Sequence, residues 1–315
     1  MLGWGSWANT QKLAGTDRWP FELYYWDYAI GVFLFGILFT FTAGSFGSSG
    51  MSAPANLQQA DAGNIGSAVF SGALFNLSNI LLVVAIDAAG MSVAFPLGVG
   101  LALVIGTVGS YLQAPKGNPA LIFAGVTLVV FAMIMSALAY GKLPRAPGRS
   151  WSRGIIFAVT AGALMGFFYP QLISSISPNF QAAEIEAGYL TPYTALLSFG
   201  LGLLLSNFIV NTAFMKTGGR SYGEYFRGTL RLHSLGILGG AIWMLALSLN
   251  VIASGVAGPA ISYALGQGAT LVAAIWGVLI WREFREAPKG TTPYIILMFL
   301  GYACGLTLIG IATLS

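Results

Sequence analysis

The chain has 315 residues, of which 56% are hydrophobic and only 8% are charged. A soluble domain carries roughly 25% charged residues, so a water-covered surface cannot be built from this composition. The net charge is +4, but the basic residues lie in short segments between apolar runs and form no continuous face, which argues against a nucleic-acid partner. The single cysteine, Cys304, and single histidine, His233, exclude a disulfide framework and a Cys/His metal site.

The first segment, Met1 to Leu13, is apolar and aromatic but would reach only about 20 Å as a helix. The hydrocarbon core is roughly 30 Å thick, so we expect a partial first span, supported by its neighbours or begun earlier in the natural gene product. Hydropathy then predicts nine complete spans, each near the roughly 20 residues that a crossing needs. They cover residues 27–46, 65–86, 91–113, 120–140, 154–175, 191–214, 232–253, 259–281 and 293–314.

Basic residues predict the orientation of these ten spans. Thirteen of the 14 lysines and arginines fall on odd-numbered connections, and only Lys116 falls on an even one. Because cytoplasmic connections are enriched in Lys and Arg, the odd connections are expected in the cytoplasm and both termini outside. We expect a multi-pass protein of the bacterial inner membrane.

An internal repeat appears when the second half is shifted by 168 residues onto the first. Gly72-Ala73 then meets Gly240-Ala241, and Leu97-Gly98-x-Gly100 meets Leu265-Gly266-x-Gly268; after a five-residue insertion, Ala114-Pro115-Lys116-Gly117 meets Ala287-Pro288-Lys289-Gly290. The predicted fold is an all-α polytopic membrane protein of ten transmembrane helices, in two inverted five-helix repeats at 1–141 and 154–315 joined by a cytoplasmic connector at 142–153. Inverted repeats typically place a substrate site at their interface, near the bilayer midplane.

Uncharged polar and aromatic side chains within the spans are the candidate substrate-binding groups. Rings stack on flat or C–H surfaces while amides fix orientation, so such a set suits a small, neutral, polar solute. The alternative is that the amides and hydroxyls join helix to helix, which is worth about 0.6 kcal/mol on average. The candidates are Trp4, Ser6, Trp7, Asn9, Thr10, Asn76, Asn79, Tyr169, Gln171, Trp243, Tyr263 and Gln267.

Asp27, at the entrance to the second span, is the candidate proton carrier, because an acid withdrawn from water can change its protonation state during transport. Its alternative role is to cap the helix start, paired with Lys12 or Arg18. His233 is interpreted as an interfacial residue rather than a proton relay. Trp19, Trp26 and Trp151, near span ends, are interpreted as interfacial anchors.

Motifs of enzymes are not found. The sequence lacks a Gly-x-Ser-x-Gly elbow, a His-Glu-x-x-His pair and a P-loop, and has no paired aspartates deep within spans. We therefore expect neither catalysis nor a cofactor or metal.

Several motifs resemble one transporter family. They are the opening Gly-Ser-Trp, Tyr25-Trp26-Asp27-Tyr28, Asn76-Leu77-Ser78-Asn79, Val104-Ile105-Gly106-Thr107, and Trp276-Gly277-Val278 before Glu283-x-Arg285. Together they are similar to the ureide permease and glucose/rhamnose transporter branch of the drug/metabolite transporter superfamily. The resemblance implies ten spans in two inverted repeats, uptake of sugars, ureides or nucleobases, commonly with protons, and a cavity lined by the first, third, fourth, sixth, eighth and ninth spans.

The function expected from the sequence is secondary active transport of a small neutral metabolite, coupled to protons or sodium, by alternating access within membrane lipids. An exporter of hydrophobic or amphipathic compounds is the alternative, although no carboxylate lies deep enough for cationic cargo. A receptor or scaffold is disfavoured because the connections are too short to form a binding domain.

Overall fold

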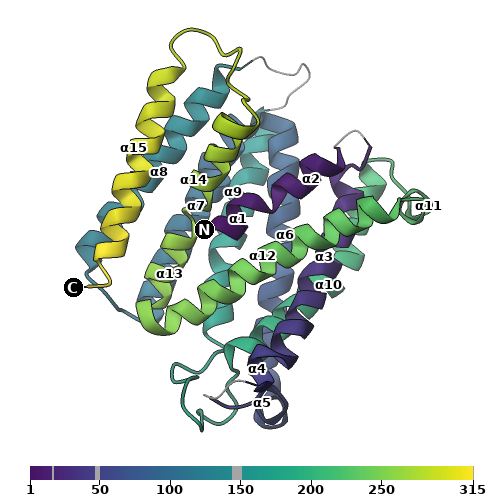
Figure 1. Cartoon of the computed structure of the whole chain (residues 1–315), viewed down its shortest axis with the longest axis vertical. Helices are drawn as coiled ribbons and strands as arrows, with labels where there is room; N and C mark the ends of the chain where they lie inside the picture. Colours follow the sequence, from purple (N-terminus) through teal and green to yellow (C-terminus); the bar gives the residue numbers. More distant parts are fainter. Residues whose placement is uncertain (16–17, 47–49, 144–150, 315) are drawn as a thin grey trace. The chain divides into compact units, whose positions relative to one another are not determined.

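The computed structural model describes residues 1–15, 18–46, 50–143 and 151–314 (Figure 1). Within these ranges the chain is helical and forms no strand, only the isolated bridges of Ala60 with Gly188 and Ile176 with Leu190. In a bilayer, a helix satisfies every backbone hydrogen bond within its own segment, which explains the choice of structure.

The helices follow the predicted spans, with short helices added in the connections. Their bounds are α1 Leu2–Ser6, α2 Ala8–Ala14, α3 Phe21–Phe41, α4 Ala43–Phe46, α5 Ala53–Gln59, α6 Ala62–Ala89, α7 Met91–Gln113, α8 Pro119–Gly141, α9 Trp151–Ile173, α10 Pro192–Thr217, α11 Tyr222–Phe226, α12 Leu230–Ala257, α13 Pro259–Gly266, α14 Ala269–Ile275, the π-helical η1 Trp276–Ile280, and α15 Thr292–Ile311.

Nine helical segments of the described residues are long and apolar enough to cross a membrane, which confirms the nine complete spans. The first of them begins at Phe21, six residues before its predicted start. The partial span is two short helices, α1 and α2, separated at Trp7. The ten-helix inverted arrangement itself stays a prediction, as do the boundaries of the two sequence halves, and residues 144–150 of the predicted connector lie outside the described ranges.

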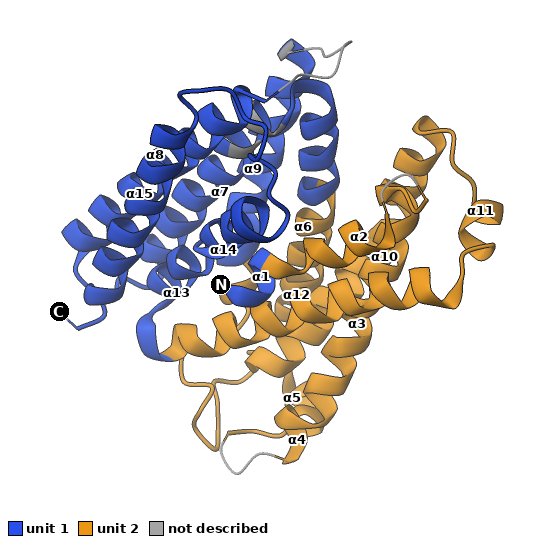
Figure 2. Ribbon diagram, turned by 45° about the horizontal axis from the view of Figure 1, so that its top comes forward, with its two compact units in different colours: residues 1–5, 78–170, 256–315 blue, residues 6–77, 171–255 orange. Residues whose placement is uncertain are grey.

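The chain divides into two compact units, coloured separately in Figure 2. Unit 1 comprises residues 1–5, 78–170 and 256–315, and unit 2 comprises residues 6–77 and 171–255. Each unit therefore takes helices from both halves of the sequence. The divisions fall inside α1, α6, α9 and α12.

In unit 1, α8 and α15 lie side by side (Figure 1) and approach closely at glycine. A Cβ on Gly125 would lie 2.7 Å from the Gly305 carbonyl, and one on Gly305 would lie 2.8 Å from the Gly125 carbonyl. Two further glycines, Gly90 and Gly258, precede α7 and α13 with φ of 85° and 89°, a conformation that favours glycine. They are partners in the 168-residue alignment.

In unit 2, two pairs of helices pack closely at glycines, two of which, Gly72 and Gly240, occupy equivalent positions in the two halves of the sequence. A Cβ on Gly72 of α6 would lie 2.0 Å from the Phe199 carbonyl of α10, and one on Gly240 of α12 would lie 2.0 Å from the Tyr28 carbonyl of α3. The reciprocal contacts match too, because Gly202 of α10 meets Val69 of α6 while Gly31 of α3 meets Ile237 of α12. The α6–α10 pair and the α12–α3 pair therefore pack in the same way, with a glycine of each helix against the backbone of the other.

Among the described residues, three contacts join connections, or the start of the next helix, of the same parity. In unit 2, the second and sixth connections join through the Asp61 amide and the Gly188 carbonyl at 3.0 Å, and the first and seventh through the stacked rings of Trp19 and Tyr225. In unit 1, Lys142 of the fifth connection lies over the Tyr294 ring just past the ninth. A chain that changes sides at every span places all odd connections on one side of the membrane and all even connections on the other, which agrees with these contacts.

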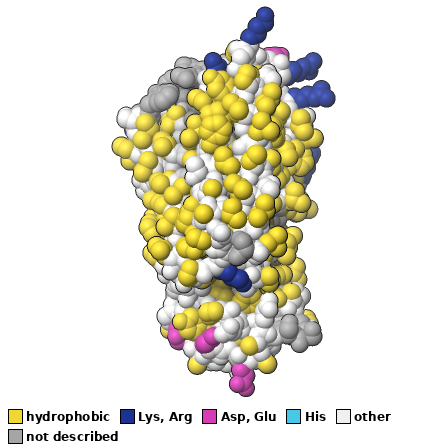
Figure 3. Space-filling model, turned by 90° about the vertical axis from the view of Figure 1, so that its left-hand side faces the viewer, with side chains coloured by type: hydrophobic (Ala, Val, Ile, Leu, Met, Phe, Trp, Pro, Cys, Tyr) yellow, Lys and Arg dark blue, Asp and Glu magenta, His cyan; other side chains and the backbone are white. Residues whose placement is uncertain are grey.

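The outer faces of the helices carry apolar side chains. On the face shown in Figure 3, hydrophobic side chains cover most of the surface and charged ones are few. Over the described residues as a whole, the exposed large apolar side chains include Leu205 and Ile209 of α10, Leu245 and Leu249 of α12, and Leu297 of α15. Such surfaces suit lipid rather than water.

Candidate functional site

The most unusual polar residue of unit 2 is Asp27, a carboxylate buried inside the spanning helix α3. It is the seventh residue of the helix and only 1% exposed. The helix start has no side-chain cap, so the alternative that Asp27 caps it is wrong. A carboxylate here must be compensated by hydrogen bonds or a positive partner.

Two side chains from the other end of the sequence provide that compensation. The Tyr225 hydroxyl of α11 donates to Asp27 Oδ1 at 2.7 Å, and His233 Nδ1 of α12 lies 2.8 Å from the same oxygen. The second oxygen, Oδ2, is buried with no hydrogen-bond partner in the described structure. His233 is therefore directly linked to the carboxylate, which the sequence interpretation as an interfacial residue missed.

Trp19 covers this triad of Asp27, Tyr225 and His233. Its ring stacks on Tyr225 with centroids 6.1 Å apart and meets His233 edge-on at 5.2 Å. Trp19 is 3% exposed, and Trp26 is buried as well, donating to Met215 Sδ at 2.9 Å. Both predictions of an interfacial anchor are wrong, because these rings pack against protein. The side chain of Trp151 lies outside the described residues.

Tyr225 lies outside the spanning helices, in the connection between α10 and α12. Burial, and then its hydrogen bond to Asp27, raise the pKa of its hydroxyl above the ordinary value of 10.0. The physical cause is that a phenolate would lose solvation and would face a carboxylate. Tyr225 therefore remains a donor to Asp27 at neutral pH.

An aromatic cluster occupies the middle of unit 2, made of Trp7, Tyr28, Phe75, Phe199 and Trp243. Tyr28 lies between the two predicted tryptophans, with centroids 4.9 Å from Trp7 and 6.3 Å from Trp243. Phe75 and Phe199 pack on Trp243 at 4.3 and 5.9 Å. The buried Tyr28 hydroxyl has no partner among the described residues. The cluster is thus an aromatic surface at which the Tyr28 hydroxyl is available to water or a solute.

The polar candidates of unit 2 mostly hold structure together. Asn9 donates to the Ser6 carbonyl at 2.9 Å, and the Thr10 hydroxyl pairs with that of Tyr24 at 2.6 Å. Asn76 donates to Ser206 at 2.9 Å and Gln171 to Ser67 at 2.7 Å. The bond of Asn9 is local, whereas the other three contacts join different helices, as in the alternative reading; the buried Asn76 Oδ1 keeps no partner in the described ranges.

In unit 1, the structure brings together the predicted Tyr169 and Tyr263. Their centroids are 4.7 Å apart, and the Tyr263 hydroxyl donates to the Ala102 carbonyl at 3.3 Å. The ring fits against α7 because Gly106 has no side chain; a Cβ there would lie 2.2 Å from the ring. The glycine of the Val104-Ile105-Gly106-Thr107 motif is therefore required by this tyrosine.

Gln267 lies at a break in the ninth span. Helix α13 ends at Gly266 and α14 starts at Ala269, whereas the aligned α7 continues without a break past Gly98 and Gly100. The Gln267 carbonyl accepts from the Thr270 amide at 3.1 Å and from its hydroxyl at 2.8 Å. The amides of Gln267 and Gly268 are also bonded, to the Tyr263 and Leu265 carbonyls at 3.1 and 2.9 Å, so the break is a tight turn within the span. Discontinuous helices recur at transporter substrate sites. The only sequence signal was the Gly-x-Gly pair.

The remaining candidates of unit 1 are Trp4 and Asn79. Trp4 is half-buried, and the next residue, Gly5, packs on α14, since a Cβ there would lie 2.5 Å from the Ala269 carbonyl. Asn79 Nδ2 is buried without a partner in the described ranges, as are the hydroxyls of Thr107 and Ser110 on α7. Sequence reasoning did not select the two hydroxyls, because Thr and Ser in apolar helices commonly bond their own backbone.

The predicted set is therefore found in two groups. Trp4, Asn79, Tyr169, Tyr263 and Gln267 belong to unit 1, and Ser6, Trp7, Asn9, Thr10, Asp27, Asn76, Gln171 and Trp243 belong to unit 2. The residues that the sequence did not select are Tyr28, Tyr225 and His233 in unit 2. Their role depends on contacts across about 200 positions of the chain, as between Asp27 and Tyr225.

Comparison with known proteins supports the sequence resemblance over part of the chain. Residues 24–142, fewer than half of the chain, match the family model of the ureide permeases. No curated protein matches. Among 17 matching chains of solved structures, one described only as "Crystal structure of protein" is 16% identical, with a TM-score of 0.63 over 99% of this chain and 94% of that one. At this identity the likeness concerns the fold alone.

Proposed function

We propose that this protein is a secondary active transporter that takes up a small neutral polar metabolite, of the ureide, nucleobase or sugar type, together with protons. The observation that carries the proposal is Asp27, a carboxylate 1% exposed within a spanning helix and linked to His233 and Tyr225. Ionisable residues at such positions typically serve ion or proton pathways. The match of residues 24–142 to ureide permeases supports the substrate class.

The aromatic and amide groups support a neutral, ring-shaped cargo. The half-buried Trp7 and the buried Tyr28 and Trp243 form an aromatic surface in unit 2, and the buried Tyr169 and Tyr263 form one in unit 1. Rings of this kind stack on flat or C–H faces, while an amide such as Asn79, or the Tyr28 hydroxyl, would fix the orientation of the solute.

The proposed mechanism is alternating access between inverted repeats. The recurrence of the Gly72–Phe199 and Gly240–Tyr28 contacts supports it, because equivalent packing lets each half adopt the conformation of the other as access switches sides. Protonation of Asp27 would remove its charge and weaken its hydrogen bonds to Tyr225 and His233. The state of the triad would then bias the equilibrium between the two conformations.

Transport in proteoliposomes tests the proposal. The substrate is first chosen from sugars, ureides and nucleobases by the rise in melting temperature that each causes. Wild-type protein should then accumulate it when a proton gradient is imposed, and Asp27→Asn should abolish accumulation. The same variant should retain exchange of labelled for unlabelled substrate, which needs no gradient.

The exposed carboxylate Glu184 provides the matched control, and Glu184→Gln should accumulate substrate as the wild type does. Retained exchange in Asp27→Asn would show that the variant is folded. Gradient-driven accumulation by Asp27→Asn at the wild-type level would remove Asp27 from coupling. Failure of every substrate class to stabilise the wild-type protein or to be transported by it would reject the proposed substrate.

A further inference from the structure

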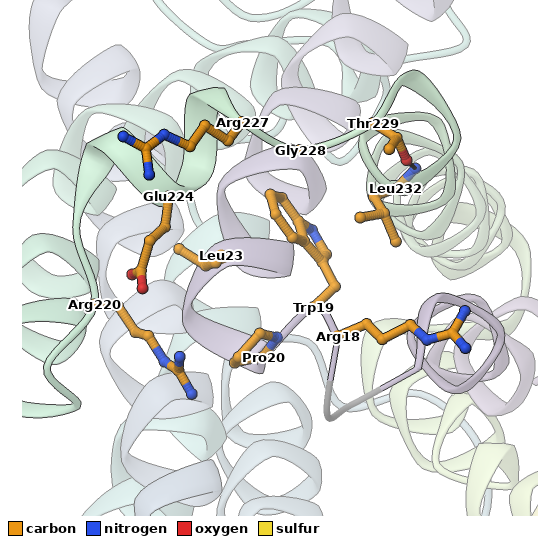
Figure 4. A pocket seen from close by; sticks show the side chains of 10 residues that line it. All are labelled: Arg18, Trp19, Pro20, Leu23, Arg220, Glu224, Arg227, Gly228, Thr229 and Leu232. Atoms are coloured by element: carbon orange, nitrogen blue, oxygen red, sulfur yellow. Dashed lines mark hydrogen bonds between the residues drawn. The ribbon is translucent and has the colours of Figure 1, made fainter.

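Unit 2 contains a cavity of about 270 Å³ below its first and seventh connections. Arg18, Arg220 and Arg227 line it together with the buried Trp19 and one acid, Glu224. Figure 4 shows Arg220, Glu224 and Arg227 on one side of the Trp19 ring and Arg18 on the other. Arginines about 200 positions apart in the chain thus line one cavity.

Within the described residues, no acidic side chain forms an ion pair with the three arginines of this cavity. Glu224 is already engaged, since its Oε2 accepts from the Ser221 amide at 2.9 Å and completes the cap of α11. Three arginines against one occupied carboxylate leave an excess of positive charge and N–H donors at the cavity, and the guanidinium group pairs well with phosphate oxygens.

Placement of positive charge on one side of the membrane explains why arginines are present here, but it does not explain why they share a cavity. Arg231, in the first turn of α12, follows the same bias and does not line the cavity. The remaining walls are apolar and come from Pro20, Leu23 and Leu232. A ligand for this cavity therefore has an anionic group and an apolar part or edge.

The margin of the cavity adds an apolar surface. Phe226 and Leu230, which flank Arg227 and Gly228 in sequence, are 77% and 84% exposed. Large apolar residues beside arginines where a chain leaves the membrane are typical of contact with headgroups and the first carbons of lipid chains.

From this arrangement we propose that the cavity of Arg18, Arg220 and Arg227 binds the phosphate group of an anionic ligand, with an anionic phospholipid headgroup as its source. The cavity borders the triad, because Trp19 lines the cavity and also packs on Tyr225 and His233, but the proposal does not rest on the transport mechanism above. The alternative source is a free phosphate compound, which shares the chemistry of the headgroup but would not use Phe226 and Leu230.

Binding to the purified full-length protein in detergent distinguishes the sources. The probes are short-chain phosphatidylglycerol, short-chain phosphatidylcholine, glycerol 1-phosphate and inorganic phosphate, each titrated while the melting temperature is followed. Phosphatidylglycerol should stabilise the protein saturably and phosphatidylcholine should not. Equal stabilisation by inorganic phosphate or glycerol 1-phosphate would overturn the lipid assignment and leave a free-phosphate site.

Matched arginine variants locate the site. Arg220→Gln and Arg227→Gln should each weaken phosphatidylglycerol binding about tenfold or more, the usual effect of losing one charge-assisted hydrogen bond. Arg231→Gln makes the same change of charge outside the cavity and should alter the affinity less than about twofold. Equal weakening by all three variants would indicate general surface attraction, and no response of the wild-type protein to any anionic probe would overturn the proposal.

Discussion

At the scale of single residues, glycine determines how closely the helices of unit 2 approach. Gly240→Ala would place a Cβ 2.0 Å from the Tyr28 carbonyl, so we expect the free energy of unfolding to fall by about 1–3 kcal/mol. Gly72→Ala should have a similar effect, because its contact with Phe199 has the same geometry. Gly66→Ala on α6 meets nothing within 4 Å and should be neutral or gain up to about 1 kcal/mol. Thermal unfolding in one detergent compares the three variants, and equal losses in all of them would contradict the close-approach argument.

Also at the residue scale, Tyr225 links stability to alkaline pH. Because its folded pKa lies above its ordinary 10.0, its contribution is complete below that pH and is lost as pH rises beyond it. When the pH is raised from about 9 to about 11, the melting temperature of Tyr225→Phe should therefore fall less than that of the wild type. A Tyr225→Phe slope equal to that of the wild type would refute the assignment.

At the scale of elements, the buried Asn56 of α5 fixes the connection between α9 and α10. Its Nδ2 donates to the Tyr189 carbonyl and its Oδ1 accepts from the Thr191 amide, both at 2.9 Å, and from the Thr194 hydroxyl. Asn56→Ala should destabilise the fold by about 2–4 kcal/mol, since several buried groups lose partners. Cleavage after Glu184 or Glu186 by a glutamate-specific protease should become faster. Gln58→Ala, at an exposed position of α5, is the control. Equal cleavage rates in Asn56→Ala and Gln58→Ala would show that the hydrogen bonds of Asn56 do not hold the connection.

At the scale of the whole molecule, the parity of the connections predicts which ends share a side of the membrane. In a Cys304→Ser background, Gln58→Cys and Glu184→Cys should react with an impermeant maleimide from outside intact cells. Arg220→Cys and Lys142→Cys should react only after the membrane is opened. Labelling of Gln58→Cys and Arg220→Cys from the same side would overturn the ten-crossing topology.

Much of the fold was predictable because the bilayer limits the choices. Apolar runs near the length of a crossing predicted nine spans, and the structure has nine such segments in its described residues. The break at Gln267 was not predictable, because Gly98 and Gly100 at the aligned positions lie in an unbroken helix. The burial of Trp19 and Trp26 was missed because position near a span end says nothing about which neighbour covers the ring.

The sequence by itself determined the membrane class, the number of long spans and the glycine register, since hydropathy and the spacing of small residues are local properties of the chain. Only the tertiary structure decided that Asp27 meets Tyr225 and His233, and that Arg18 shares a cavity with Arg220 and Arg227. The physical reason is that these groups interact over a few ångströms in space while lying about 200 residues apart in the chain. No sequence periodicity predicts contacts between residues so far apart in the chain. These contacts form only when α3, α11 and α12 pack together.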